Sequence, residues 1–251
     1  DRIEHRFMLM WRRVIASKVD AAITNTKQGK RYLCECLGMV SEKVFVHPYE
    51  VPNMKAYLDS VESHVKRGHS VVFATVGQLI YRKGVVQLVE AAYVLSQQRP
   101  DKSFQLWIIG DGPLRNELES KVNYLGLQRR VRFFGWIDNE GLALYLKKVH
   151  VFVFPTLEDV WGVAPLEAMA MGIPVLCSKY AGASELVEDG VDGWIFDPHN
   201  PKELAELMKR FVDNPALITT MGENARRKME AFTPKAAAEF LKRVAIWVAT
   251  Q

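Results

Sequence analysis

The sequence predicts an α/β fold built around a doubly wound parallel sheet, and three observations predict it. From Val71 onward, short apolar runs alternate with longer amphipathic stretches, which is the pattern of repeated β-α units. The apolar runs lack polar alternation, as is typical of strands that are buried on both faces of a parallel sheet. Glycine or proline follows several of these runs, as expected where a buried strand gives way to a loop.

Composition limits the class of protein. The chain has 251 residues, of which 49% are hydrophobic, enough for one large domain or one and a half small ones. No apolar stretch approaches the roughly 18 residues of a membrane span, and there is no signal-peptide pattern. Cys34, Cys36 and Cys177 do not complete a metal site, so we interpret them as reduced thiols of a cytoplasmic protein. The net charge of +4 fits an anionic ligand or an anionic membrane surface.

The first eighteen residues, Asp1–Lys18, form a basic amphipathic pattern. Apolar side chains recur at helical spacing, which predicts a helix with one apolar face. We favour a helix packed onto a domain core. One alternative is a membrane-surface helix, which would place the protein at the inner face of the membrane; another is a face whose partner surface is missing.

A β-α-β unit follows this helix. We expect a strand at Val19–Thr24, a helix capped by Asn25 or Thr26 that runs to Gly38, and a second strand at Lys43–His47. The polar, irregular residues 51–70 are then interpreted as a linker.

The rest of the chain is expected to form the parallel sheet and its helices. Strands are predicted at residues 71–77, 104–109, 131–135, 149–154 and 175–177, with an edge strand at 193–196. Helices are predicted from residue 85 to 97, after Pro113 to about 126, and at 165 onward, 201–214, 215–230 and 234–248, with a helix-like segment at 185–187.

The most informative stretch is Pro155–Val175, PTLEDVWGVAPLEAMAMGIPV. Pro165 is expected at the first position of a helix just beyond a strand, where free backbone amides form an anion site. Asp159 and Glu167 lie close by, with seven residues between them. Each has a simpler interpretation: Asp159 as an Asx-turn residue, and Glu167 as a carboxylate placed by the helix dipole or a capping box, although Ala164 would give that box no side-chain oxygen.

The pattern D-x-W-G-x-x-P-L-E-A-M-A-x-G-x-P-V resembles the acidic-x7-acidic motif of the family 4 (group 1) glycosyltransferases of GT-B fold. Most members have Glu at the first acidic position, where this chain has Asp159, preceded by Glu158. The resemblance begins at about Val19 and implies a Rossmann-like, nucleotide-sugar-binding C-terminal domain at residues 71–232. Residues 1–50 would be a remnant of the N-terminal domain, most of which would be absent. Residues 233–251 would be the helix that crosses back onto that domain.

The resemblance also implies roles for the residues of this stretch. In the family the first acid, here Asp159, contacts hydroxyls of the donor sugar, and the second, here Glu167, holds the nucleotide ribose. The amides between them face the diphosphate; they belong here to Gly162, Val163 and Ala164.

A second segment contributes cations. The family has Gly-Arg and then Lys-Gly after the first strand of this domain, with the Arg and Lys gripping the donor diphosphate. Here Gly77 and Lys83 match, but Gln78 stands in the place of the arginine, and Arg82 is the neighbouring cation. The alternative is that Arg82 and Lys83 form an ordinary solvated loop.

Three further positions follow from the resemblance. Trp136 and Ile137 would line the nucleobase pocket, and Glu185, in a G-x-x-E-[IL]-V element, would help frame the donor site. The alternatives are a surface aromatic for Trp136, a core residue for Ile137 and a helix-start carboxylate for Glu185.

Together these features predict a retaining glycosyltransferase fragment, which would transfer a sugar from a UDP-, GDP- or ADP-sugar to the hydroxyl of an unknown acceptor. Lys83 and the amides near Gly162 would stabilise the diphosphate leaving group, with no metal and no cofactor. One alternative is a non-catalytic nucleotide-sugar-binding module; another is a nucleotide-sugar epimerase or a phosphorylase of the same fold. No hydrolase or zinc motif is present, and no nucleic acid is expected, since only the first eighteen residues approach a basic stripe.

Overall fold

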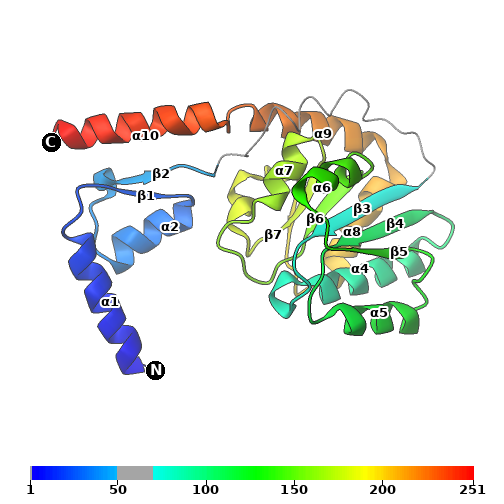
Figure 1. The fold of residues 1–251 in the computed structure, drawn as a ribbon. Coiled ribbons are helices and arrows are strands. Elements are labelled where there is room, and N and C mark those ends of the chain that lie inside the picture. Colours follow the sequence, from blue (N-terminus) through cyan, green and yellow to red (C-terminus); the bar gives the residue numbers. More distant parts are fainter. Residues whose placement is uncertain (1, 50–69) are drawn as a thin grey trace. The chain divides into compact units, whose positions relative to one another are not determined.

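The computed structural model describes residues 2–49 and 70–251 and divides the chain into two compact units (Figure 1). Unit 1 combines residues 1–52 with residues 232–251, and unit 2 spans residues 53–231. The predicted linker, residues 51–70, lies outside the described residues except for Ser70.

Unit 2 is built on six parallel strands in the order β5-β4-β3-β6-β7-β8, which confirms the predicted α/β fold class (Figure 1). The strand predicted at residues 193–196 lies at an edge, as expected. The strands are β3 Val71–Val76, β4 Phe104–Ile109, β5 Val131–Gly135, β6 Val151–Phe154, β7 Val175–Ser178 and β8 Gly193–Phe196.

Helices cover both faces of this sheet. Helix α4 packs on α8, and α7 packs on α9 on the opposite face (Figure 1). The large core between the sheet and α4 and α8 includes Phe73, Leu88 and Phe211, all fully buried. The helices of unit 2 are α4 Val85–Gln98, α5 Arg115–Tyr124, α6 Asn139–Leu146, α7 Ala164–Ala170, α8 Pro201–Asp213 and α9 Ala216–Met229.

The sheet has its switch point between β3 and β6. From β3 the chain moves outward to β4 and β5, and from β6 it moves outward in the other direction to β7 and β8. The loops that leave the carboxyl ends of β3 and β6 therefore run apart from one crevice. In doubly wound sheets this crevice is where ligands bind.

Some predicted elements differ from the observed ones. Helix α6 was not predicted, because its sequence NEGLALYL is short and contains a glycine; its available signal was Asp138, whose carboxylate accepts a hydrogen bond from the Gly141 amide at 2.7 Å. Helix α7 begins at Ala164 rather than Pro165, so Val163 is the cap residue. The segment expected at 185–187 is a 3-10 helix that already starts at Gly182.

Unit 1 contains a β-α-β unit, as predicted, with parallel strands β1 Ala22–Thr24 and β2 Val44–Val46. Thr26, rather than Asn25, caps α2 Lys27–Arg31, because its hydroxyl accepts a hydrogen bond from the Gly29 amide at 2.8 Å. A π-helical turn, Tyr32–Cys36, continues α2, and a 3-10 turn, Ser41–Lys43, precedes β2.

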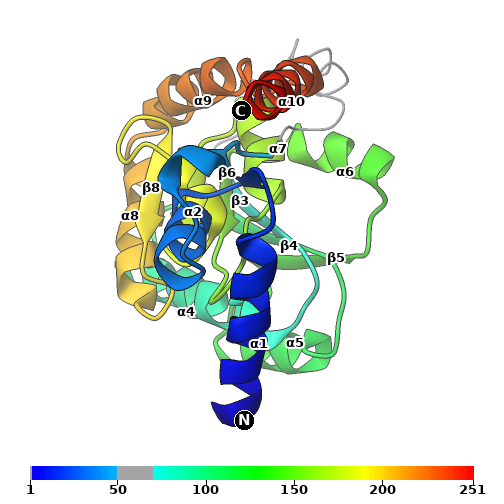
Figure 2. The same cartoon turned by 90° about the vertical axis from the view of Figure 1, so that its left-hand side faces the viewer.

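Helix α1, Arg2–Ala16, was predicted as a helix, but its expected packing onto a core is wrong for most of its length. Phe7 and Trp11 remain 57% and 54% exposed, and the helix extends away from β1 and α2 (Figure 1 and Figure 2). Among its described side chains, from Phe7 onward, Ala16 in the last turn is the one buried in the small core of unit 1. The Arg13 guanidinium donates to the Cys36 carbonyl at 2.8 Å and fastens this end.

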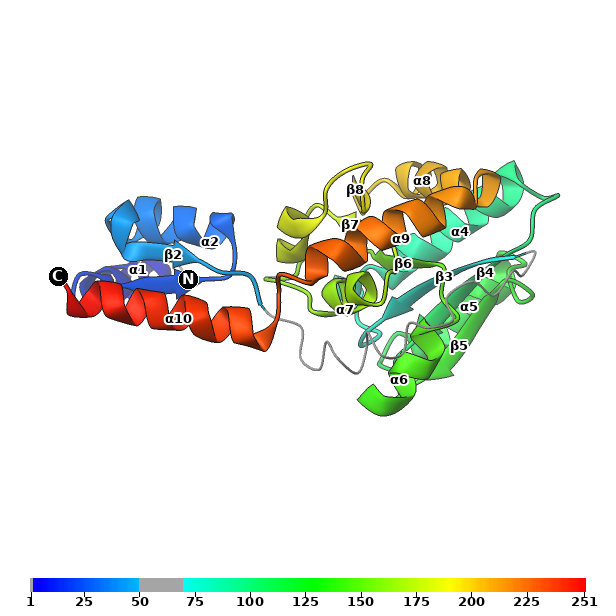
Figure 3. The same cartoon turned by 90° about the horizontal axis from the view of Figure 1, so that it is seen from above.

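The last helix, α10 Pro234–Ala249, lies beside β2 within unit 1 (Figure 3). Trp247 meets Phe45 edge-on at 5.2 Å between ring centroids, and Phe240 lies 4.3 Å from His47. Within the described ranges, none of the helices is both long and apolar enough to span a membrane.

Candidate functional site

The loops that follow β3 and β6 meet at the switch point. The first, residues 77–84, contains a 3-10 turn at Tyr81–Lys83 and ends at Gly84, whose φ is +67°. A Cβ atom at Gly84 would lie 1.8 Å from the Pro155 carbonyl oxygen. Glycine is therefore required here, both for its left-handed backbone and for the close approach of the two loops.

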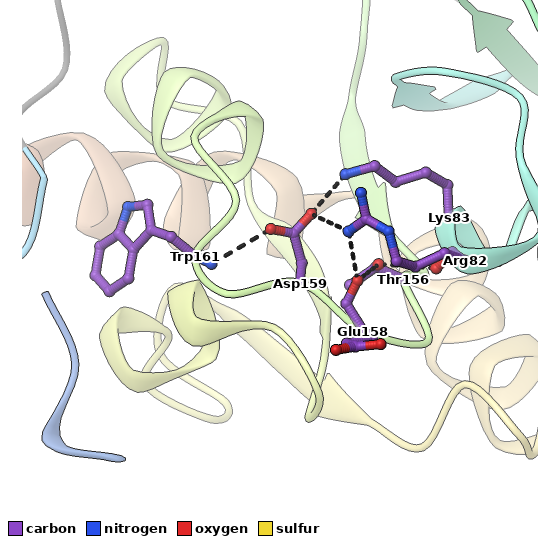
Figure 4. Close-up of polar contacts among 6 residues, drawn as sticks. All are labelled: Arg82, Lys83, Thr156, Glu158, Asp159 and Trp161. Atoms are coloured by element: carbon purple, nitrogen blue, oxygen red, sulfur yellow. Dashed lines mark hydrogen bonds and ion pairs between the residues drawn. The ribbon is translucent and has the colours of Figure 1, made fainter. Parts of the chain in front are cut away.

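Hydrogen bonds to main-chain carbonyls hold the two loops together. The Leu157 amide donates to the Arg82 carbonyl at 2.8 Å, and the Arg82 guanidinium donates to the Glu158 carbonyl at 2.9 Å. The hydroxyl of Thr156, which is fully buried, lies 3.0 Å from the Arg82 carbonyl and 2.9 Å from that of Glu158 (Figure 4). These bonds fix the backbone positions from which the side chains of both loops extend.

The centre of the site is an ion pair between the two loops. The Lys83 ammonium lies 2.5 Å from Oδ2 of Asp159, and the Arg82 guanidinium lies 3.7 Å from the same oxygen (Figure 4). The Lys83 and Asp159 side chains are only 21% and 15% exposed. Figure 4 shows the Glu158 carboxylate turned away from Lys83, so Asp159 is the acid that faces the cations.

A third loop, after β7, holds the acidic loop from its other side. The Asp159 amide donates to the Tyr180 carbonyl at 3.2 Å, and the Gly182 amide donates to the Asp159 carbonyl at 3.1 Å. The Trp161 amide also donates to Oδ1 of Asp159 at 3.3 Å, which is the Asx-turn contact considered from the sequence. Asp159 thus has both a local structural contact and a cation partner.

The segment between the two acids is tightly packed. Gly162 has φ +94°, and a Cβ atom there would lie 2.6 Å from the Phe154 ring. Because Val163 caps α7, Glu167 is the fourth helical residue rather than the third, which rules out the capping-box alternative. Glu167 is half-buried in the first turn of α7, on the carboxyl side of the sheet.

Three of the predicted diphosphate residues, Gly77, Gln78 and Lys83, line one small recess, whereas Arg82 and residues 162–164 do not line it. Gly77 and Gln78 follow β3 directly, and the Lys83 ammonium lies 5.4 Å from the centre of the Phe154 ring. Gln78 is exposed and supplies no charge. The recess is lined by Thr75, Gly77, Gln78, Lys83, Phe154 and Pro155.

The structure does not bring every predicted residue to this recess. Trp136 and Ile137 follow β5, which β4 separates from β3; Trp136 is 77% exposed and Ile137 is half-buried. Glu185 is exposed on the 3-10 helix beyond β7. Lys179 is another cation in the loop after β7. Its ammonium donates a hydrogen bond to the Asp197 carboxylate at 2.8 Å, and this bond lowers the pKa of the Asp197 carboxyl.

Sequence reasoning missed Thr156 and the backbone of Tyr180. Thr156 directly follows Pro155 at a strand end, and this position was the only signal that could have marked it. For Tyr180 there was no signal, because its contact uses a main-chain oxygen whose partner is set by the sheet order.

We expect Cys177, in β7, to react very slowly with thiol reagents. Burial, with a smaller effect of the Asp159 charge, raises the pKa of its thiol far above the ordinary range, so the thiolate is not formed at neutral pH. A maleimide should therefore label the half-buried Cys34 and Cys36 first, leaving Cys177 at least about a hundredfold slower. Mass spectrometry of the folded chain, with the urea-unfolded chain as control, would measure this; equal rates in the folded chain would contradict it.

No group of three or more His, Cys, Asp or Glu side chains is placed to hold a metal ion among the residues that the structure describes.

The family model described as "Glycosyl transferases group 1" matches residues 58–228. The parallel sheet and the matched family model thus define the class of this protein. The chain is a member of the group 1 glycosyltransferases, as the resemblance of its acidic motif predicted.

Known proteins similar to this chain are glycosyltransferases and related synthases. The α-D-kanosaminyltransferase of Streptomyces kanamyceticus is 33% identical over 60% of this chain and 38% of its own length. Sucrose-phosphate synthase from Thermosynechococcus elongatus has a solved structure with TM-score 0.78 and 26% identity, covering 98% of this chain and 62% of that one. Anabaena HepE, solved in complex with UDP, has TM-score 0.75 and 21% identity over 93% of this chain and 64% of its own. The chain therefore spans less than two thirds of each of these proteins.

Proposed function

We propose that this chain carries the donor-binding part of a retaining glycosyltransferase that uses a nucleoside diphosphate sugar. The observation that carries the proposal is the Lys83–Asp159 pair at the switch point, where one loop offers a cation and the other a carboxylate. A cation suits a diphosphate, and a carboxylate suits sugar hydroxyls. The acidic motif that resembles family 4 supports retention of the anomeric configuration.

Each residue has a role in this proposal. Lys83 neutralises the charge that grows on the diphosphate as the sugar leaves, and the amides of residues 162–164 add hydrogen bonds. Asp159 orients the sugar, and Glu167 holds the ribose. Because Lys83 and these amides supply the stabilisation, we propose that no metal ion takes part.

The choice of nucleotide and the location of the acceptor site are also part of the proposal. The complex of Anabaena HepE with UDP favours UDP as the first nucleotide to test, with GDP and ADP as the other candidates. Trp136 and Ile137 are proposed near the base. The acceptor hydroxyl is expected to be bound largely by parts of the relatives that this chain does not span.

A second candidate is a nucleotide-sugar-binding module without turnover. Gln78, exposed and uncharged where the family has arginine, favours it, because a weaker diphosphate site stabilises the leaving group less. We propose a cytoplasmic location for either function on the basis of three free cysteines. Contact of α1 with an anionic membrane surface stays a prediction.

Calorimetric titration of the 251-residue chain with UDP, GDP and ADP tests the proposal. One nucleotide should bind saturably, and Lys83→Ala should weaken its binding about tenfold or more, because a charge-assisted contact is lost. Glu167→Ala should weaken it about tenfold through the lost ribose hydrogen bonds.

Lys202→Ala is the matched control, since Lys202 is an exposed lysine at the start of α8. Its affinity should equal that of the unchanged chain. The proposal would be contradicted if a chain shown to be folded by circular dichroism bound none of the three nucleotides.

A further inference from the structure

We propose that Lys83 changes partner when the donor binds, so that the diphosphate releases Asp159 for the sugar. This inference rests on the proposed function and adds a sequence of events to it. In the nucleotide-free chain Asp159 pairs with the Lys83 ammonium, so an incoming diphosphate must compete with Asp159 for that group. Asp159 therefore has two roles. It binds the sugar, and it competes with the diphosphate of the nucleotide for the Lys83 ammonium.

The competition follows from the geometry of the pair. Lys83 and Asp159 are 2.5 Å apart and largely shielded from solvent, so the carboxylate neutralises the charge that a diphosphate would need. A phosphate placed against Lys83 would also come close to the Asp159 carboxylate. Like charges repel strongly where solvent screening is weak, so one of the two anions must give way.

Arg82 remains as a partner of the released carboxylate. Its guanidinium is already 3.7 Å from Oδ2 of Asp159 and is held in place by its 2.9 Å bond to the Glu158 carbonyl. The Trp161 amide keeps its bond to Oδ1. Asp159 can thus lose Lys83 without losing its orientation, and Oδ2 becomes available to a sugar hydroxyl.

The test is a substitution that should improve binding. Asp159→Asn keeps the shape of the side chain and removes its charge, so the chain should bind the active nucleotide among UDP, GDP and ADP about fivefold more tightly. Inorganic pyrophosphate should show the same gain, because the competition concerns only the phosphates. Affinities would be measured by calorimetry at one fixed ionic strength, since salt screens charge interactions.

Asp213→Asn is the control, because Asp213, at the end of α8, pairs with Arg99, at the end of α4, in a different part of unit 2. Loss of this pair should leave the affinity unchanged. Asp159→Ser is the second variant, since its hydroxyl can still accept from the Trp161 amide. Equal or weaker binding by both folded variants would overturn the inference while leaving the proposed function intact. If neither variant folds, Asp159 is a structural residue and the inference is also overturned. Absence of nucleotide binding in the unchanged chain would instead reject the proposed function.

Discussion

Lys228→Met is expected to lower the free energy of unfolding by about 3–5 kcal/mol, the cost of leaving a buried carboxylate without its cation. Lys228, in α9, forms an ion pair with Asp192, which is fully buried, and donates to the Leu186 carbonyl at 2.9 Å. Methionine fills the same space but cannot pair with the carboxylate. Urea unfolding at neutral pH, followed by circular dichroism, would measure the loss.

Two companion variants isolate the cause. Lys209→Met breaks a pair with Glu206, which is 49% exposed, and should cost less than about 1 kcal/mol. Adding Asp192→Asn to Lys228→Met should restore much of the lost stability, because no uncompensated charge then remains. A cost for Lys228→Met as small as that for Lys209→Met would show that the pair does not stabilise the fold.

Gly84→Ala is expected to lower the free energy of unfolding by about 3 kcal/mol or more, since a left-handed residue gains a side chain that overlaps the backbone. The new methyl group would lie 1.8 Å from the Pro155 carbonyl oxygen, so the loops after β3 and β6 must separate. Because Lys83 and Asp159 lie on these loops, nucleotide binding should be lost in the same variant.

Gly126→Ala is a matched control for this substitution. Gly126 has φ +69°, almost the same as the +67° of Gly84, but a Cβ atom there would meet nothing within 4 Å. It should therefore cost only the conformational penalty of about 1 kcal/mol and leave nucleotide binding unchanged. Equal losses for the two variants would mean that the close approach of the loops adds nothing.

The sheet could be predicted from the sequence because each buried strand is a continuous apolar run. The strands at 104–109, 131–135 and 193–196 have the predicted limits. The packing of α1 could not be predicted, because its apolar spacing states which face is apolar but not what covers it. The start of α7 was misjudged by one residue, because proline is tolerated at more than one position of a first turn.

The site could be predicted only in part, for a related reason. Lys83 and Asp159 are 76 residues apart, and the resemblance placed both at the donor site, but nothing in the chain indicated that they pair with each other. That pairing depends on β3 and β6 being neighbours and on Gly84 admitting the Pro155 carbonyl. Contacts made by main-chain atoms, such as those of Arg82 and Tyr180, leave no trace in residue type.

The main-chain fastening of the three loops also bears on how this enzyme family can diversify. Since the Leu157 amide, the Tyr180 carbonyl and the Gly182 amide hold the site, the side chains at positions 157 and 180 are not needed for that purpose. They can change in size and polarity while the cation and the acid keep their places. Sequence change at these two positions is therefore compatible with an unchanged scaffold. Proline at position 157 is the exception, because it would remove the amide N–H that donates to the Arg82 carbonyl.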